Sequence, residues 1–311
     1  MRTLALLVAL SIPALSAAQS PDAPEHLSPA VLRYVKYDTA KNTLWLDHVR
    51  VIDGTGAAAL EDATVILSDG KIAAILPHPD KSHMAAWGCA DCPPALHLDL
   101  TGHTLFPGLV GMHDHMYYLT RPNLDITGAS EPPVVVPEMS FSSPRLYLAA
   151  GVTTLRTTGS VEPYLDLNMR RAIDAGELVG PHMDITAPYL EGPNSPFIQM
   201  HNLTGPDDAR NFVDYWAAQG VTSYKAYMNI TRAELKAAVD AAHAHHLKVT
   251  GHLCAVTYPE AAEIGIDNLE HGFFVNTQND PGKQPDLCPR STGGPTLANM
   301  DPDGPDATAL I

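Results

Sequence analysis

Two histidines, followed much later by a lysine and two further histidines, are the residues of this 311-residue sequence best suited to metal chemistry. His113 and His115 close an apolar segment and stand two residues apart. If that segment is a β-strand, both side chains point to one face of it, so both imidazoles can bind one metal ion. Such a pair alone is weak evidence, because strands also carry histidines with no such role.

Three later residues strengthen this interpretation. Lys225, His252 and His271 each fall near the C-terminal end of an expected strand, and a parallel barrel assembles its active site at these ends. Neutral imidazole nitrogens suit a divalent metal. An ammonium group beside a metal would be repelled, but burial there depresses the lysine pKa, and the neutral amine can capture carbon dioxide. The resulting carbamate offers two oxygens that can bridge two metal ions.

The elements that must position these residues are short apolar runs separated by longer segments, as expected of repeating strand and helix units. Thr231 and Glu234 form a capping box, and the apolar residues after it recur at helical spacing, which predicts a helix between two parallel strands. The expected strands are Leu105–Met112, Val152–Arg156, His182–Thr186, Val221–Met228, Lys248–His252 and Asp267–His271.

Upstream of these strands, residues 44–76 alternate apolar and polar positions around Asp53-Gly54 and Asp69-Gly70. Asp-Gly between such runs is a strong hairpin signal. The pattern predicts a small antiparallel unit over residues 42–105.

These residues, with the stretch Val-Ile-Asp-Gly-Thr-Gly at 51–56 and Phe-Pro-Gly at 106–108, resemble the amidohydrolase superfamily of metal-dependent hydrolases, in particular its imidazolonepropionase-related and prolidase-like branch. The resemblance covers residues 42–275. It implies an α/β fold, with a distorted TIM (β/α)8 barrel over 106–275, of which the first six strands are present, and a small β-sandwich domain over 42–105.

For the site, the resemblance implies that His113 and His115 bind one metal, that His252 and His271 bind the other, and that carboxylated Lys225 bridges the two. It implies two zinc ions, with manganese or iron as alternatives, and hydrolysis of a carbon–nitrogen, amide- or peptide-like bond of a small molecule by metal-activated water. Tyr227 lies two residues after Lys225 and could donate to the developing oxyanion, or could simply pack in the core.

The sequence departs from the family pattern at its C-terminal end. Members carry an aspartate after the eighth strand as general base, and no residue is assigned that role here. Residues 276–311 are rich in proline and glycine, so we expect a loop-like tail. We therefore expect the front part of a longer enzyme, which could be inactive alone.

Three alternatives stay open at this stage: a deaminase with one metal, a lactone or ester hydrolase of the same superfamily, and an inactive fragment or non-catalytic binding protein. Lys225 argues against the single-metal alternative, because a bridging carbamate serves two metals. Among weaker candidates, Cys254 could be a thiolate ligand but is better read as a small buried hydrophobe. Glu270 is expected on the strand face opposite His271, where it could only support a ligand from behind or have a structural role. His243, His245 and His246 are expected on the surface at a helix end.

Composition limits the partners and the compartment. Nineteen basic against 35 acidic residues give a formal charge of −16, which disfavours nucleic acid and anionic membranes. Residues 1–18 have the pattern of a signal peptide, so we expect export to the periplasm or medium, with no membrane attachment after cleavage. The sequence leaves open the oligomeric state. It also leaves open the pairing of the four cysteines, which are Cys89, Cys92, Cys254 and Cys288.

Overall fold

The computed structural model of the chain describes residues 43–77, 95–117, 119–120, 134–135, 140–193 and 200–311. The expected signal peptide, and Cys89 with Cys92, lie outside these residues. The chain divides between Pro107 and Gly108 into two compact units, and each is described by itself. None of the described helices combines the length and apolar character needed to cross a membrane.

Unit 1 is one mixed β-sheet with strands in the order β3-β2-β1-β4, and β5 also pairs with β1. β1, β2 and β3 are antiparallel neighbours, whereas β4 and β5 run parallel to β1. The purely antiparallel unit expected from sequence is therefore wrong in this respect, because the chain returns beside β1 in the same direction. The five strands are β1 (Thr43–Val51), β2 (Leu60–Ser68), β3 (Lys71–Pro77), β4 (Ala95–Asp99) and β5 (Thr104–Leu105).

The two Asp-Gly signals in this unit behave differently. Asp69 and Gly70 form a tight turn between β2 and β3, and both have positive φ, at 52° and 68°. That is the backbone such hairpin turns require. Asp53-Gly54 instead lies within the longer connection 52–59 between β1 and β2.

Unit 2 repeats parallel strands and helices. Its strands form one sheet in the order β10-β9-β6 and a second in the order β11-β12-β13-β14, and every pairing within them is parallel. This is the α/β architecture expected of a TIM-barrel-like fold, and among the described residues these two sheets do not close into a cylinder. The strands are β6 (Leu109–Asp114), β9 (Val152–Thr157), β10 (His182–Asp184), β11 (Thr186–Leu190), β12 (Ser223–Ala226), β13 (Lys248–Gly251) and β14 (Asn268–Leu269).

Each of the six expected strand segments overlaps a strand, but the third, His182–Thr186, covers β10 and only the first residue of β11. β10 and β11 are separated only by Ile185, and they pair with different neighbours, β9 and β12. A further short antiparallel pair is formed by β7 (Leu119–Thr120) and β8 (Val134–Val135).

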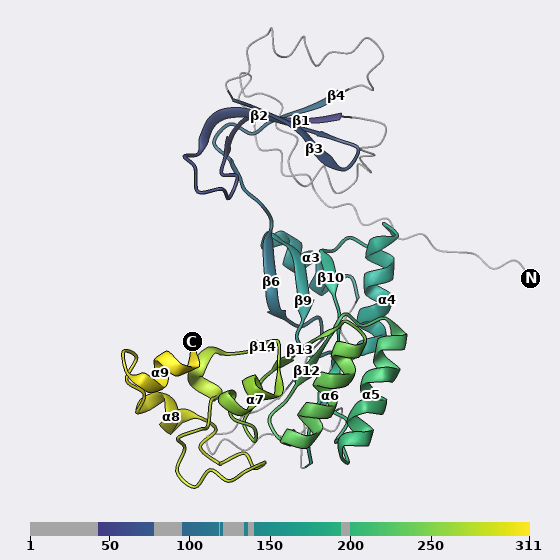
Figure 1. Cartoon of the computed structure of the whole chain (residues 1–311). Helices are drawn as coiled ribbons and strands as arrows, with labels where there is room; N and C mark the ends of the chain where they lie inside the picture. Colours follow the sequence, from purple (N-terminus) through teal and green to yellow (C-terminus); the bar gives the residue numbers. More distant parts are fainter. Residues whose placement is uncertain (1–42, 78–94, 118, 121–133, 136–139, 194–199) are drawn as a thin grey trace, which may run out of the picture. The chain divides into compact units, whose positions relative to one another are not determined.

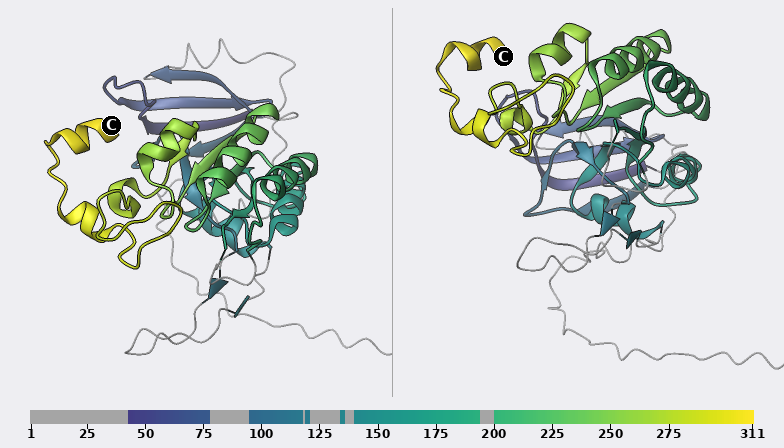
Figure 2. Two further views of the ribbon diagram at one scale, coloured as in Figure 1. Left: turned by 60° about the horizontal axis from the view of Figure 1, so that its bottom comes forward. Right: turned by 90° about the horizontal axis from the view of Figure 1, so that it is seen from below.

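Helices pack along the outside of the parallel strands. Figures 1 and 2 show α5 and α6 side by side next to β12 and β13, and the core between them includes the fully buried side chains of Tyr224, Leu235 and Val249. The helices are α3 (Ser142–Ala149), α4 (Pro163–Asp174), α5 (Pro206–Gln219), α6 (Arg232–Ala244), α7 (Tyr258–Ile264), the 3-10 helix η1 (Gly272–Val275), α8 (Gly294–Ala298) and α9 (Pro305–Leu310).

The segment 276–311 is more ordered than the loop-like tail expected from its composition. Two short helices, α8 and α9, each have proline in the first turn, where its missing N–H costs nothing. Asp280 organises the turns before α8. Its carboxylate accepts hydrogen bonds from Ser291, from Gly293 N and from both the N–H and the hydroxyl of Thr296.

The capping box predicted for α6 is confirmed. Glu234 N–H donates to Thr231 Oγ1 at 3.3 Å, and Thr231 N–H donates back to Glu234 Oε2 at 2.9 Å. We expect Thr231→Ala to destabilise the chain by about 1 kcal/mol, measured from urea unfolding, because it exposes an unpaired N–H. Thr231→Ser keeps the hydroxyl and should retain most of that stability; an equal loss in both variants would assign the effect to the lost methyl group instead.

Candidate metal centre

Four histidines that the sequence singled out lie together at the C-terminal ends of β6, β13 and β14. The ring centroid of His113 is 5.5 Å from that of His115 and 4.6 Å from that of His271. His252 completes the group, with its ring centroid 4.3 Å from that of His271. Residues as much as 158 positions apart in sequence are thus brought to one place by the parallel order of the strands.

Three of these imidazoles are held in the neutral form. Burial, with help from the charge of His113, lowers the pKa of His115 to about 4. Burial also lowers the pKa of His252 to about 3 and that of His271 to about 4, and the charge of Lys225 adds to both effects. At neutral pH each of these rings therefore keeps a nitrogen lone pair, which is the form that binds a metal ion.

Lys225 lies in β12 with its side chain in the interior. The residue is 1% exposed, and its Nζ has no hydrogen-bond partner within the part of the chain that the structure describes. Burial lowers its pKa to about 7, against an opposing effect of Glu270. Its charge acts on His115, His252 and His271, so the amine lies within electrostatic range of the histidine group.

Glu270 does not point away from the histidines as strand alternation predicted. β14 ends at Leu269, and His271 has a φ of 67°, in the left-handed region. That backbone breaks the alternation, and the Glu270 carboxylate lies 2.8 Å from Nδ1 of His113. The hydrogen bond to His113 and the charge of Lys225 hold the pKa of Glu270 at about 2, although burial alone would raise it.

Tyr227 packs beside the histidine group. The residue is 8% exposed, and its ring centroid lies 4.9 Å from that of His252 and 4.8 Å from that of Tyr189. The structure thus places its ring next to a predicted ligand and within an aromatic cluster at the same time.

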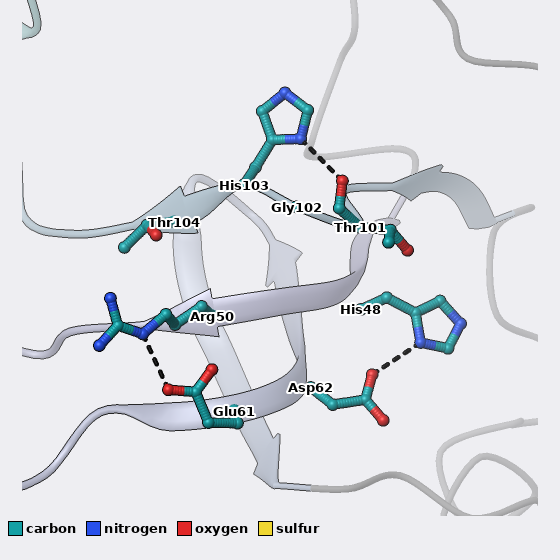
Figure 3. A pocket seen from close by; sticks show the side chains of 8 residues that line it. All are labelled: His48, Arg50, Glu61, Asp62, Thr101, Gly102, His103 and Thr104. Atoms are coloured by element: carbon teal, nitrogen blue, oxygen red, sulfur yellow. Dashed lines mark hydrogen bonds and ion pairs between the residues drawn. The ribbon is translucent and has the colours of Figure 1, made fainter.

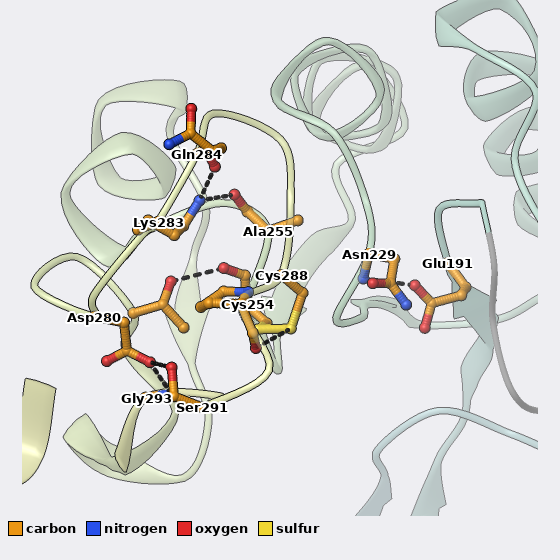
Figure 4. The surroundings of a disulfide bond; sticks show 12 residues. Glu191, Asn229, Cys254, Ala255, Asp280, Lys283, Gln284, Cys288, Ser291 and Gly293 are labelled. Carbon is orange, nitrogen blue, oxygen red and sulfur yellow. Dashed lines mark hydrogen bonds between the residues drawn. A yellow bond between two sulfur atoms is a disulfide. The ribbon is translucent and has the colours of Figure 1, made fainter. Parts of the chain in front are cut away.

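Cys254 is buried, at 2% exposure, as the sequence led us to expect, but it is not a free cysteine. Its sulfur is bonded to that of Cys288 in a disulfide (Figure 4). An oxidised cysteine carries no thiolate, so this pairing rules out a ligand role for the disulfide-bonded form. The sequence offered no signal for it, because four cysteines allow three pairings.

The other histidine cluster is a surface feature, as expected. His243 Nε2 lies 2.9 Å from Asp267, and His245 Nε2 lies 2.7 Å from Asp214. Both histidines are exposed. Their partners are carboxylates on neighbouring elements, so these side chains are tied to the surface rather than to the group around His113.

The donor types of the site suit a divalent transition metal, but the rings stand edge to face. The His113 ring is tilted 79° from that of His115, and the His252 ring is tilted 67° from that of His271. Among the described residues, no three His, Cys, Asp or Glu side chains are arranged to hold a metal ion. The fit therefore rests on donor chemistry: several neutral imidazoles beside a buried amine whose polar atom is unsatisfied.

Unit 1 carries a shallow pocket of a different kind (Figure 3). It is lined by residues of β1 and β2 and by residues 101–104. The charged side chains there already pair with each other, His48 with Asp62 and Arg50 with Glu61, each at 2.8 Å. Those pairs are exposed to solvent, so each contributes little to the stability of the fold.

Comparison with known proteins places the chain in a family. The model of the amidohydrolase family matches residues 104–278, which is more than half of the chain. The protein therefore belongs to the amidohydrolase family, as its sequence motifs suggested. No curated protein sequence matches it.

Solved structures agree on the fold. The chain is similar to a Xaa-Pro dipeptidase with bound methionine (18% identity, TM-score 0.56, covering 75% of this chain and 62% of that one). It is also similar to a prolidase complexed with N-methylphosphonate-L-proline (20% identity, TM-score 0.55, covering 74% of this chain and 61% of that one). A third similar structure is bottromycin amidohydrolase (21% identity, TM-score 0.53, covering 79% of this chain and 46% of that one). The chain thus spans between 46% and 62% of the length of these proteins.

Proposed function

We propose that the protein is a metal-dependent hydrolase that cleaves a carbon–nitrogen bond of a small molecule such as a dipeptide or N-acyl amino acid. The observation that carries the proposal is the gathering of four imidazoles at the ends of parallel strands. The buried, unsatisfied amine of Lys225 acts electrostatically on three of them, His115, His252 and His271. Family membership and the fold shared with dipeptidases support the same class of reaction.

The proposed ligands are His113 and His115 for one ion and His252 and His271 for a second, with Lys225 bridging both as its carbamate. Zinc suits imidazole donors, and manganese and iron are the alternatives. A divalent metal bound there supplies Lewis acidity and lowers the pKa of water that it binds.

The chain's own residues prepare the site for this chemistry. Burial keeps His115, His252 and His271 neutral, so no proton must leave them before an ion binds. Lys225 reacts as the neutral amine: its nitrogen forms a bond to the carbon of carbon dioxide, and the proton that it loses passes to solvent. We assign Tyr227, beside His252, as donor to the oxygen of the substrate carbonyl.

We also propose that the protein is exported. The signal-peptide pattern of residues 1–18 supports this, as does the disulfide between Cys254 and Cys288, because such bonds persist in oxidising compartments.

The experiment that tests the function measures metal uptake and dipeptide hydrolysis by the purified chain. We expect the metal-free protein to take up two equivalents of zinc per chain, determined by elemental analysis after dialysis, and His252→Ala/His271→Ala to lose at least one of them. His246→Ala is the matched control, because that histidine is exposed at the end of α6 and should leave uptake unchanged. Equal zinc uptake by the double variant, or none by the unaltered chain, would contradict the proposal.

A further inference from the structure

The side chain of Glu270 is a buried carboxylate held by groups from four strands or their ends. It is 7% exposed. Oε1 accepts hydrogen bonds from Arg156 Nη2 at 2.7 Å, from Asn268 Nδ2 at 3.1 Å and from the hydroxyl of Thr250. Oε2 faces Nδ1 of His113 at 2.8 Å. A buried charge is costly unless it is paired and hydrogen-bonded, and both oxygens of this carboxylate have such partners.

The contact with His113 decides which ring nitrogen is free. A carboxylate that already accepts from an arginine, an amide and a hydroxyl is an acceptor only. The hydrogen bond at 2.8 Å therefore requires the proton on Nδ1 of His113, which leaves the lone pair on Nε2. Partners of this kind fix both the tautomer and the orientation of a ligating imidazole.

Arg156 holds both sides of this contact. Its Nη2 donates to Glu270, and its Nε donates to the carbonyl oxygen of Met112 at 3.0 Å, one residue before His113. The guanidinium thereby ties the backbone that carries His113 to the carboxylate that orients its ring. The side chain of Arg156 is 13% exposed, so this bridge is largely shielded from water.

The left-handed backbone at His271 makes the arrangement possible. With regular alternation, Glu270 and His271 would point to opposite faces. With φ at 67°, Glu270 reaches Nδ1 of His113 while the His271 ring lies 4.6 Å from the His113 ring. This left-handed conformation costs free energy for an L-residue with a side chain, and such backbone strain concentrates at functional sites.

We propose that Glu270 and Arg156 are a positioning pair that fixes His113 as the Nδ1-protonated tautomer and presents its Nε2 to a metal ion. The metal role rests on the proposed function, whereas the tautomer is a property of the metal-free chain. This difference allows the two to be tested separately.

The first measurement records the side-chain nitrogen signals of His113 in the metal-free, ¹⁵N-labelled chain at about pH 8.5, above the ordinary pKa of histidine. We expect the proton on Nδ1 in the unaltered chain and a mixture of tautomers in Glu270→Gln. Glutamine cannot replace the carboxylate, because it would turn an N–H donor toward either Arg156 or His113. An Nε2-protonated His113 in the unaltered chain would overturn the proposal.

The second measurement is zinc affinity. We expect Glu270→Gln to weaken it by about 10- to 100-fold. Arg156→Lys should weaken it less, because it keeps the charge but lacks the forked donors that reach Glu270 and Met112 together. Glu234→Gln, the same substitution at a buried glutamate that caps α6, is the control and should change neither measurement.

The outcomes separate the two ideas. If the unaltered chain binds no zinc but shows Nδ1-protonated His113 that Glu270→Gln scrambles, the positioning of the ring is supported and the proposed function fails. If zinc binds and Glu270→Gln changes neither the tautomer nor the affinity, the positioning pair is refuted while the proposed function stands.

Discussion

Lys225→Met is expected to remove the proposed bridge between two metal ions and, in the same variant, to stabilise the metal-free chain. Methionine fills a similar volume in the interior of β12 without the nitrogen, so the cavity that alanine would leave is avoided. Loss of the bridge should lower zinc uptake and reduce any hydrolytic rate by on the order of 10³-fold, as when a group that stabilises transition-state charge is removed.

The gain in stability follows from the state of the lysine in the metal-free protein. Its Nζ lies buried with no hydrogen-bond partner in the described part of the chain, and removing an unsatisfied buried polar group should return about 1 to 3 kcal/mol. Urea unfolding of the two metal-free chains measures this difference in the free energy of unfolding, and elemental analysis measures the amount of zinc bound.

Two controls make the Lys225 result specific. Lys236→Met removes an exposed lysine that pairs with Asp240 on α6, and it should change neither zinc uptake nor stability by much. The carbamate itself is checked with ¹³C-labelled bicarbonate, which should give a carbamate signal in the unaltered chain and none in Lys225→Met. A Lys225→Met chain that is less stable and keeps its zinc would show that the amine has a structural role instead.

Local patterns predicted much of this site because its candidate ligands lie at or near the ends of strands. The i, i+2 spacing of His113 and His115 and the single residues Lys225, His252 and His271 needed only the parallel order of the strands to meet. Parallel order follows from the alternation of strand-like and helix-like segments, which is a local property of the sequence. The capping box at Thr231 is local in the same sense, and it was also correctly predicted.

The contacts that the sequence did not reveal depend on single backbone angles or on distant pairs. Nothing in the residue type of His271 announces a left-handed backbone, so alternation placed Glu270 on the wrong face. The role of Arg156, the last residue of an expected strand, has no local sequence signal, because its partners Met112 and Glu270 come from two other strands. The break at Ile185 between β10 and β11 depends on which neighbour each half pairs with.

Loss of the disulfide between Cys254 and Cys288 is expected to destabilise the chain strongly. The bond joins residues 34 positions apart. In the chain-entropy model, removing a cross-link that closes a loop of this length should lower the free energy of unfolding by about 3 to 4 kcal/mol. The disulfide ties the segment before α8 to the residues that follow His252. Figure 4 shows Lys283 reinforcing this link: its Nζ donates to the carbonyl oxygen of Ala255 at 2.7 Å.

Cys254→Ala/Cys288→Ala should therefore unfold at lower urea concentration and be cut faster by protease between residues 279 and 293, where the described backbone is mostly irregular. Because His252 lies two residues from Cys254, we also expect weaker zinc binding, by less than the loss caused by removing a ligand. The reagent control is reduction: dithiothreitol should convert the unaltered chain to the behaviour of the double variant and leave the double variant unchanged. Identical protease sensitivity before and after reduction of the unaltered chain would show that Asp280 and Lys283 hold this segment without the covalent bond.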